Sequence, residues 1–191
     1  MPWTKALRQL QERAVFLKEC GHFQELPDLS DGVLTETLSH WLMPFLDRVT
    51  SAAGLKRVNL SSALSSLLPW KAQQMIENHA PTHVTVPSGS RIPLQYRDDK
   101  GPLVSPVLAV RLQEMFGLTK SPAIARGRIM VTLHLLSPAG RPVQITKDLE
   151  SFWKNTYHDV KKDLMGRYPK HYWPEDPLAA LPTKRVKPRG Q

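Results

Sequence analysis

The stretch THVTVPSGSRIPLQY, residues 82–96, is where the pattern of the chain changes from helical to extended. Apolar residues alternate on either side of PSGS, with Val84 and Val86 on one arm and Ile92 and Leu94 on the other. Alternation on two arms around small residues at 88–90 is typical of a β-hairpin. Because helical spacing precedes Pro81, the fold is expected to combine helices with a β unit.

Upstream of this hairpin, residues 1–80 are expected to be helical. Leu7, Leu10, Ala14 and Leu17 recur at spacings of three and four, which indicates one buried helix face. Thr4 is a suitable N-cap for this helix and Gly21 a suitable stop. Further helices are expected over 31–46, where Pro44 should end or kink the helix, behind an Asn59 cap, and from Pro69 to about His79.

Downstream, a second hairpin is expected where RIMVTLHLL (128–136) turns through SPAGRP into VQIT (143–146). Between the hairpins lies SPVLAVRLQEMFG, residues 105–117. Ser105 can cap a helix, Pro106 suits its first position and Gly117 suits the position after its end. A helix is therefore predicted over 105–117.

After the second hairpin, a helix is expected from Asp148 to Leu164, ended by Gly166. The fold class predicted is α+β: a helical segment, a small OB-like antiparallel β unit with an inserted helix, then a C-terminal helix and an extended basic tail. The expected divisions are a helical accessory region at 1–80, the OB-like unit at 81–147, a helix with a proline- and aromatic-rich strap at 148–181, and a disordered basic tail at 182–191.

Composition points to an anionic partner. The 191 residues include 26 Lys and Arg against 17 Asp and Glu, a formal charge of +9. Nucleic acid is the usual partner of such a domain, although a merely cationic surface is the alternative. The single cysteine, Cys20, excludes an intrachain disulfide and fits a reducing cytosol. With no signal peptide or membrane span evident, we expect a soluble, cytoplasmic and monomeric protein without membrane contact.

The search for catalytic motifs is negative. GLTKS at 117–121 lacks the glycine spacing of a phosphate-binding loop. His79 and His83 are four residues apart, but Pro81 breaks the helix that would align them for a metal. No catalytic residue, metal site or bound cofactor is therefore predicted within this chain.

Three segments are candidate contact surfaces for nucleic acid. The first is the PSGS tip beside Arg91, and the second is the last predicted strand, flanked by Arg141 and Lys147. The third is GRYPKHYWPEDP, residues 166–177, where rings could stack on unpaired bases while cations meet phosphates. Alternatively, its rings pack the C-terminus onto the domain as a strap. The candidate residues are Arg91, Arg141, Lys147, Arg167, Lys170, Tyr172 and Trp173.

Several long segments occur together in a recognisable order. They are WLMPFL (41–46), SLLPW (66–70), HAPTHVTVPSGSRIPLQY (79–96), VRLQEMFGL (110–118), LHLLSPAGRPVQITKDLESFW (133–153) and GRYPKHYWPEDP. Across essentially its whole length, the chain resembles the C-terminal region of bacterial HrpB-type DExH-box ATP-dependent helicases.

The resemblance implies that ATP, Mg²⁺ and NTP hydrolysis belong to motor domains that this chain lacks, so that the chain alone is not expected to hydrolyse ATP. Two roles are then open. The chain could be an accessory region that contacts single-stranded RNA or DNA and completes a nucleic-acid channel. Alternatively, it could be a docking module that braces the motor domains or binds another protein, without a nucleic-acid site of its own.

Overall fold

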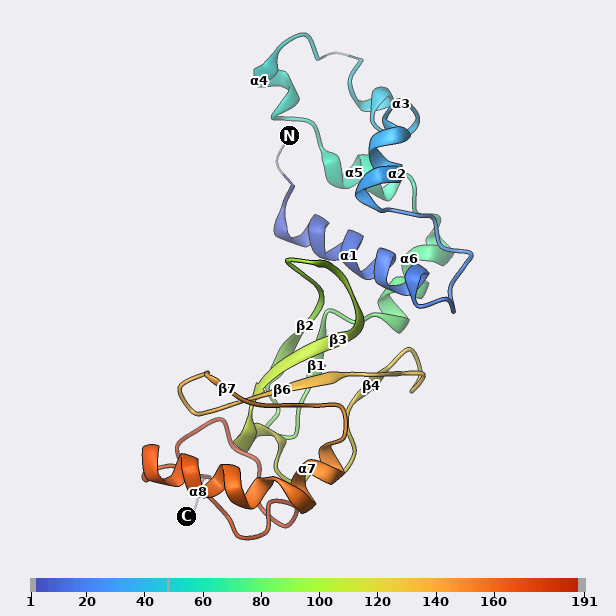
Figure 1. Cartoon of the computed structure of the whole chain (residues 1–191). Coiled ribbons are helices and arrows are strands. Elements are labelled where there is room, and N and C mark those ends of the chain that lie inside the picture. Colours follow the sequence, from blue (N-terminus) through green and yellow to red (C-terminus); the bar gives the residue numbers. More distant parts are fainter. Residues whose placement is uncertain (1–2, 48, 189–191) are drawn as a thin grey trace. The chain divides into compact units, whose positions relative to one another are not determined.

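Residues 3–47 and 49–188 are described by the computed structural model, in which the chain divides into two units (Figure 1). The first unit comprises Met1–Pro81 with Tyr96–Val104, and the second comprises Thr82–Gln95 with Ser105–Gln191. The predicted mixture of helices and a β-sheet is confirmed. In the part of the chain that the structure describes, no helix has the length and hydrophobicity needed to cross a membrane.

The first helix forms as its sequence predicts. Helix α1 spans Lys5–Glu19, and the Thr4 hydroxyl accepts a hydrogen bond from the backbone N–H of Leu7 at 3.2 Å. The helix ends before Gly21, whose φ of +79° suits a residue without a side chain. Leu7, Ala14 and Leu17 of the predicted apolar face are buried, and Leu10 is half-buried.

The predicted helix over 31–46 is broken into short pieces. Helix α2 spans Asp31–Glu36, α3 spans Leu38–Trp41, and the 3₁₀ turn η1 spans Met43–Phe45 and contains Pro44. The Thr37 hydroxyl donates to the backbone carbonyl of Val33, a local bond that competes with helix continuation. The remaining helices of this unit are α4 (Ala52–Leu55), α5 (Leu60–Ser65), capped by Asn59 as predicted, and α6 (Trp70–His79), which follows Pro69.

A five-stranded sheet has the order β1-β2-β3-β6-β7. Its strands are β1 (His83–Thr85), β2 (Arg91–Asp98), β3 (Gly101–Arg111), β6 (Thr132–Leu136) and β7 (Pro142–Thr146). Strands β1 and β2 pair antiparallel on either side of the PSGS turn, and β6 pairs antiparallel with β7, so both predicted hairpins are confirmed. Strands β4 (Ala123–Ile124) and β5 (Ile129–Met130) form a separate small hairpin.

The helix predicted over 105–117 is wrong. Most of this segment is strand β3, followed by the 3₁₀ turn η2 at Leu112–Met115. β3 lies between β2 and β6, and residues 105–108 are all buried. A strand covered on both faces has a continuous apolar run instead of an alternating one, and such a run is easily mistaken for a helix with a Ser-Pro start and a Gly stop.

The β unit also differs from the predicted antiparallel arrangement. β3 and β6 are parallel, with Val107 opposite Thr132 and Arg111 opposite Leu136. Neither that pairing nor the absence of the inserted helix was expected, and an OB-type barrel remains only a prediction. The C-terminal helix is likewise two helices, α7 (Leu149–Asn155) and α8 (Tyr157–Arg167), which meet at Thr156.

Aromatic rings form the core around these last helices. Phe116, at the end of η2, is fully buried and lies 6.0 Å from Trp153 and 6.1 Å from Tyr157 between ring centroids. Phe152 contacts the same two rings from α7. The C-terminal segment packs on this cluster through Tyr172 and Pro174.

Candidate nucleic-acid interface

Residues 166–177, here called the strap, pack against the second unit through their own backbone carbonyls. The Tyr157 hydroxyl donates to the carbonyl of Pro174 at 2.9 Å, and the Trp173 indole N–H donates to the carbonyl of Tyr168 at 2.9 Å. The backbone N–H of Gly117 donates to the carbonyl of Pro177, also at 2.9 Å. The carbonyls of Pro174 and Pro177 therefore tie the strap to the rest of the domain, and Trp173 is bound to the strap's own backbone.

The rings of the strap are only half-buried. Tyr172 meets Phe116 edge-on, with centroids 6.1 Å apart, and Tyr168 meets His171 at 5.9 Å. Tyr168, Tyr172 and Trp173 each keep part of their surface exposed. Packing and contact with a ligand are therefore compatible for the same rings.

A buried lysine holds the strap to α8. The ammonium group of Lys161, whose side chain is 9% exposed, donates to the carboxylate of Glu175 in the strap. This hydrogen bond lowers the pKa of Glu175, with the Lys161 charge adding to the effect. The charge of Lys161 is therefore neutralised within the domain and is not available to a ligand.

The segment after the strap, predicted as a disordered tail from residue 182, is bound to the domain over residues 182–188. The backbone N–H of Thr183 donates to the carbonyl of Gln113, and the N–H of Tyr172 donates to the carbonyl of Val186, both at 2.9 Å. The Thr183 hydroxyl accepts from the N–H of Arg185 at 3.0 Å. The disorder prediction is thus corrected for these residues, while 189–191 lie outside the described residues.

These contacts create a groove on the second unit, here called the basic groove, of about 450 Å³. Its cations come from two separate segments, the end of β3 and the tail, and the strap contributes His171. Its lining residues are Arg111, Gln113, Pro138, His171, Thr183, Lys184, Arg185 and Val186. An adjoining hollow of about 550 Å³ shares Thr183, Lys184 and Arg185 with it.

Gln113 gives the basic groove an unused hydrogen-bond donor. Its side chain is buried and its Nε2 atom has no hydrogen-bond partner among the described residues. Buried amide donors are normally paired, so an unpaired one at a groove indicates a place for a polar ligand or a water molecule. Arg111, Lys184 and Arg185 are exposed and take part in no ion pair between described residues.

The family of ATP-dependent helicase C-terminal regions named HrpB_C matches residues 41–177. The chain belongs to this HrpB C-terminal family.

Individual relatives agree with the family match. The ATP-dependent RNA helicase HrpB of Escherichia coli K12 is 45% identical over 185 residues, which are 97% of this chain and 22% of that protein. Crystal structures of the E. coli DExH-box NTPase HrpB and of the E. coli DEAH/RHA helicase HrpB match with TM-scores of 0.83 and 0.69. They share 45% and 42% identity, over 96% and 91% of this chain. The chain spans about a fifth of the length of these relatives.

Two of the contact segments predicted from sequence border the basic groove of this HrpB-family chain. Arg141 lies in the turn that contains the groove residue Pro138. Its carbonyl accepts the backbone N–H of Ser137 at 2.8 Å, and its N–H donates to the Ser137 hydroxyl at 3.1 Å. In the strap, Lys170 precedes the groove residue His171, and Tyr172 follows it. Arg141, Lys170 and Tyr172 are thus close in sequence to the groove residues Pro138 and His171, but none of the three lines the groove itself.

The other candidates lie elsewhere. Arg91 begins β2, opposite Thr85, and Lys147 follows β7; both are exposed. Arg167 pairs with Asp163 at 3.0 Å, and Trp173 is engaged with Tyr168. None of these four lines the basic groove.

The PSGS tip is a poor anion site. The Ser88 hydroxyl donates to a carboxylate oxygen of Glu114 at 2.7 Å. A carboxylate at that position repels a phosphate. A phosphate bound by Arg91 would therefore have to lie away from the PSGS turn.

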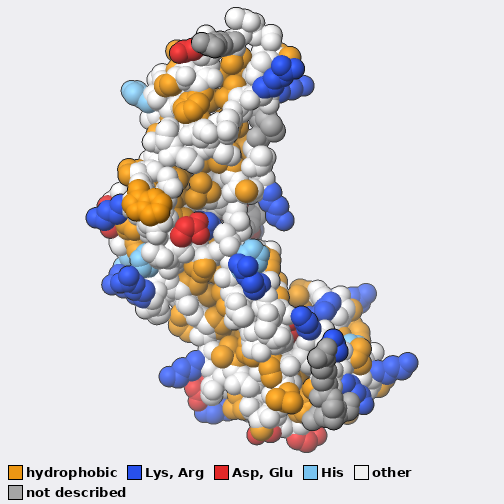
Figure 2. All heavy atoms as spheres, turned by 180° about the vertical axis from the view of Figure 1, so that it is seen from behind, with side chains coloured by type: hydrophobic (Ala, Val, Ile, Leu, Met, Phe, Trp, Pro, Cys, Tyr) orange, Lys and Arg blue, Asp and Glu red, His pale blue; other side chains and the backbone are white. Residues whose placement is uncertain are grey.

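Sequence reasoning missed Arg111, Lys184 and Arg185 as site residues. Arg111 was assigned to a helix that does not form, and the other two to a tail without a fixed position. The sequence signal for the tail was its basic run, but nothing in it indicates the backbone bond to Gln113. On the face drawn in Figure 2, the Lys and Arg side chains are dispersed instead of merged into one patch.

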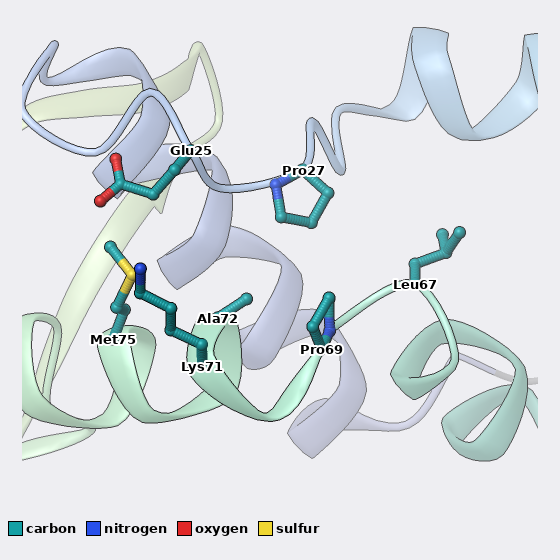
Figure 3. Close-up of a pocket in the computed structure, with 7 residues that line it drawn as sticks. All are labelled: Glu25, Pro27, Leu67, Pro69, Lys71, Ala72 and Met75. Atoms are coloured by element: carbon teal, nitrogen blue, oxygen red, sulfur yellow. The ribbon is translucent and has the colours of Figure 1, made fainter.

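The first unit has a hollow of its own, of about 310 Å³ (Figure 3). Glu25 and Lys71 are its charged lining residues, among Pro27, Leu67, Pro69, Ala72 and Met75. This set holds no nucleophile with a base. Nor does any group of three or more His, Cys, Asp or Glu side chains within residues 3–47 and 49–188 suit a metal ion.

Proposed function

We propose that this chain is a nucleic-acid-contacting accessory region of an ATP-dependent helicase, and that the basic groove is its contact surface. The supporting observation is the convergence of Arg111, Lys184 and Arg185, from two distant segments, beside the unpaired amide of Gln113. Cations of this kind meet phosphates, and half-buried rings such as Tyr172 offer a face to an unpaired base.

The motor supplies the chemistry of such a helicase. In this proposal ATP and Mg²⁺ belong to the motor domains, because the chain spans about a fifth of the E. coli helicase that it resembles. Because the E. coli relative is named an RNA helicase, single-stranded RNA is the first ligand to test, with DNA of the same sequence second.

The test is fluorescence anisotropy with a labelled single-stranded RNA across a salt series. The variant is Arg111→Gln/Lys184→Gln/Arg185→Gln, which removes three groove charges. The control Lys56→Gln/Arg57→Gln/Lys71→Gln removes three exposed charges from the first unit and leaves the same net charge.

At 0.1 M salt, each lost phosphate contact should weaken binding roughly fivefold, and the log–log salt slope should fall by about 0.7 per contact. The groove variant is expected to lose up to three such contacts and the control none. Equal losses in the two variants would show that net charge, and not the basic groove, attracts the nucleic acid.

A docking role is the second candidate, because the first unit exposes apolar side chains. Trp70 at the start of α6 is 74% exposed and Met43 in η1 is 59% exposed. Exposed large apolar groups are typical of surfaces that meet another protein. This role predicts a stable complex with helicase motor domains that the groove substitutions leave intact, together with nucleic-acid binding that is weak in parent and variant alike.

A further inference from the structure

The small hairpin of β4 and β5 has an unusual turn. Its strands pair Ala123 with Met130 and Ile124 with Ile129. Ala125, Arg126 and Gly127, which join them, have φ values of +52°, +58° and +84°. Three consecutive residues are therefore left-handed, and two of them carry side chains. In Figure 1 this hairpin, beside the β4 label, projects from the strands of the larger sheet.

Left-handed turn positions favour Gly, Asn or Asp, because a Cβ atom there crowds the backbone. Burial explains the alanine, since the side chain of Ala125 is 2% exposed and belongs to the core. Packing does not explain Arg126. It is exposed, and no ion pair or side-chain hydrogen bond between described residues involves it. The turn thus holds an arginine in a strained conformation with its guanidinium free for a ligand.

The surroundings of this arginine are basic. Between Met115 and Lys147 the sequence has five Lys or Arg and no Asp or Glu. Arg128, two residues beyond Arg126, is also exposed and takes part in none of the ion pairs found among the described residues. A ligand at the hairpin would therefore meet positive charge with no carboxylate from this stretch opposing it.

A groove lies at the base of the hairpin. It has a volume of about 450 Å³ and reaches as far as Pro122, the residue before β4. Its walls are largely apolar and Lys120 is its one charged lining residue; the others are Val84, Thr85, Val86, Pro87, Leu118, Ser121 and Pro122. Arg126 is four residues beyond Pro122 in the sequence, and the two residues of β4 lie between them.

We propose that this hairpin and the groove at its base form a second contact site for the phosphates of a single-stranded nucleic acid, separate from the basic groove. Arg126 and Arg128 meet phosphates, for which the guanidinium fork is well shaped, and Lys120 meets another beside the apolar walls that bases can cover. The inference rests on the proposed function, since it names further contacts to the same ligand.

The experiment uses the variant Arg126→Gly/Arg128→Gln in the same RNA anisotropy assay. Glycine accepts the left-handed conformation, so the turn is retained and thermal stability should be unchanged or higher. The matched control is Lys56→Gln/Arg57→Gln, which removes two exposed charges from the first unit. The expected result is roughly fivefold weaker binding per lost contact at 0.1 M salt and a salt slope lower by about 0.7 per contact, relative to this control.

Each other outcome overturns a defined part of the proposal. Binding equal to that of the control, while the basic-groove variant is weakened, overturns the hairpin site and leaves the proposed function standing. Absence of binding by the parent chain overturns both. Unchanged RNA binding with lost binding to labelled polyglutamate overturns the nucleic-acid assignment in favour of an acidic protein surface.

Discussion

Two anchors, one in each unit, bind backbone carbonyls with different kinds of side chain. In the first unit a charged group does this. The guanidinium of Arg13, whose side chain is 4% exposed, donates to the carbonyls of Ile76 and Ala80 at the end of α6 and pairs with Glu77. One residue of α1 therefore supplies a donor to the carbonyl of Ala80, which follows α6, and a second hydrogen bond to the carbonyl of Ile76, which also accepts the backbone N–H of Ala80.

In the second unit neutral aromatic groups have the corresponding role. The Trp153 indole donates to the carbonyl of Leu118 at 2.8 Å, and the Tyr157 hydroxyl donates to the strap at Pro174. The same rings contribute buried apolar area around Phe116, and burial raises the pKa of the Tyr157 hydroxyl.

The difference between the two anchors predicts which substitutions most destabilise each unit. A neutral aromatic anchor combines a hydrogen bond with a large area of packing, so removing the ring at its centre should be the most damaging change. A buried charge contributes less packing, but its loss leaves several polar groups without partners. Substitutions at the two centres can therefore be compared directly.

The largest effect is expected for Phe116→Ala, which removes the ring shared by Trp153, Tyr157 and Tyr172. The free energy of unfolding should fall by about 4 kcal/mol, as for other fully buried phenylalanines. Hydrogen exchange at increasing urea should show the loss in peptides of the second unit. The matched control, Phe45→Ala, removes a ring that is 37% exposed and should cost much less. Similar losses in both variants would contradict the role given to the aromatic cluster.

A smaller effect is expected for Arg13→Met in the first unit. Methionine replaces the buried stem but leaves the carbonyl of Ala80 without the Arg13 donor and removes the second hydrogen bond to the carbonyl of Ile76, at a cost of about 3 kcal/mol. Peptides of α1 and α6 should lose protection in the same exchange experiment. Glu77→Gln is the control, and because the Glu77 side chain is 60% exposed it should cost less than about 1 kcal/mol. If the control is as damaging as Arg13→Met, the ion pair and not the carbonyl bonds holds the helices.

The sequence predicted those elements whose signals are local. Thr4 and Asn59 cap helices as predicted, and their side chains accept the hydrogen bonds expected of caps. The two hairpins around PSGS and SPAGRP likewise follow from turn residues and alternation. In each case the interacting groups are only a few residues apart in the sequence, so a short stretch of sequence is enough to predict the interaction.

Prediction failed where the deciding contact is distant. Residues 105–117 carry sound local helix signals, but pairing with β6 buries them as a strand. The basic groove depends on the bond between Thr183 and Gln113, which are 70 residues apart in the sequence. The left-handed conformation of Arg126 was not predictable either, since glycine or asparagine is the residue that normally announces it.

The smallest effect is expected for the ion pair of Lys161 and Glu175 in the strap. Removing it tests whether a charged group also stabilises the second unit, as Arg13 does the first. Lys161 lowers the pKa of Glu175 below its ordinary value of 4.5, so the ionised carboxylate favours the folded state. This contribution is present above pH 4.5 and is lost as the pH falls through the lower pKa of the folded state. The parent chain should therefore exceed Glu175→Gln in thermal stability at neutral pH, and the two should converge in acid.

Thermal unfolding midpoints measured across that pH range would check this, with Glu150→Gln as control. Glu150 also pairs with a lysine, Lys154, but both of those side chains are well exposed, so the control should show a smaller difference from the parent. A difference for Glu175→Gln that persists in acid would mean that the strap does not depend on its carboxylate. The second unit would then be held by aromatic packing and neutral hydrogen bonds alone, which would make its contrast with the first unit complete.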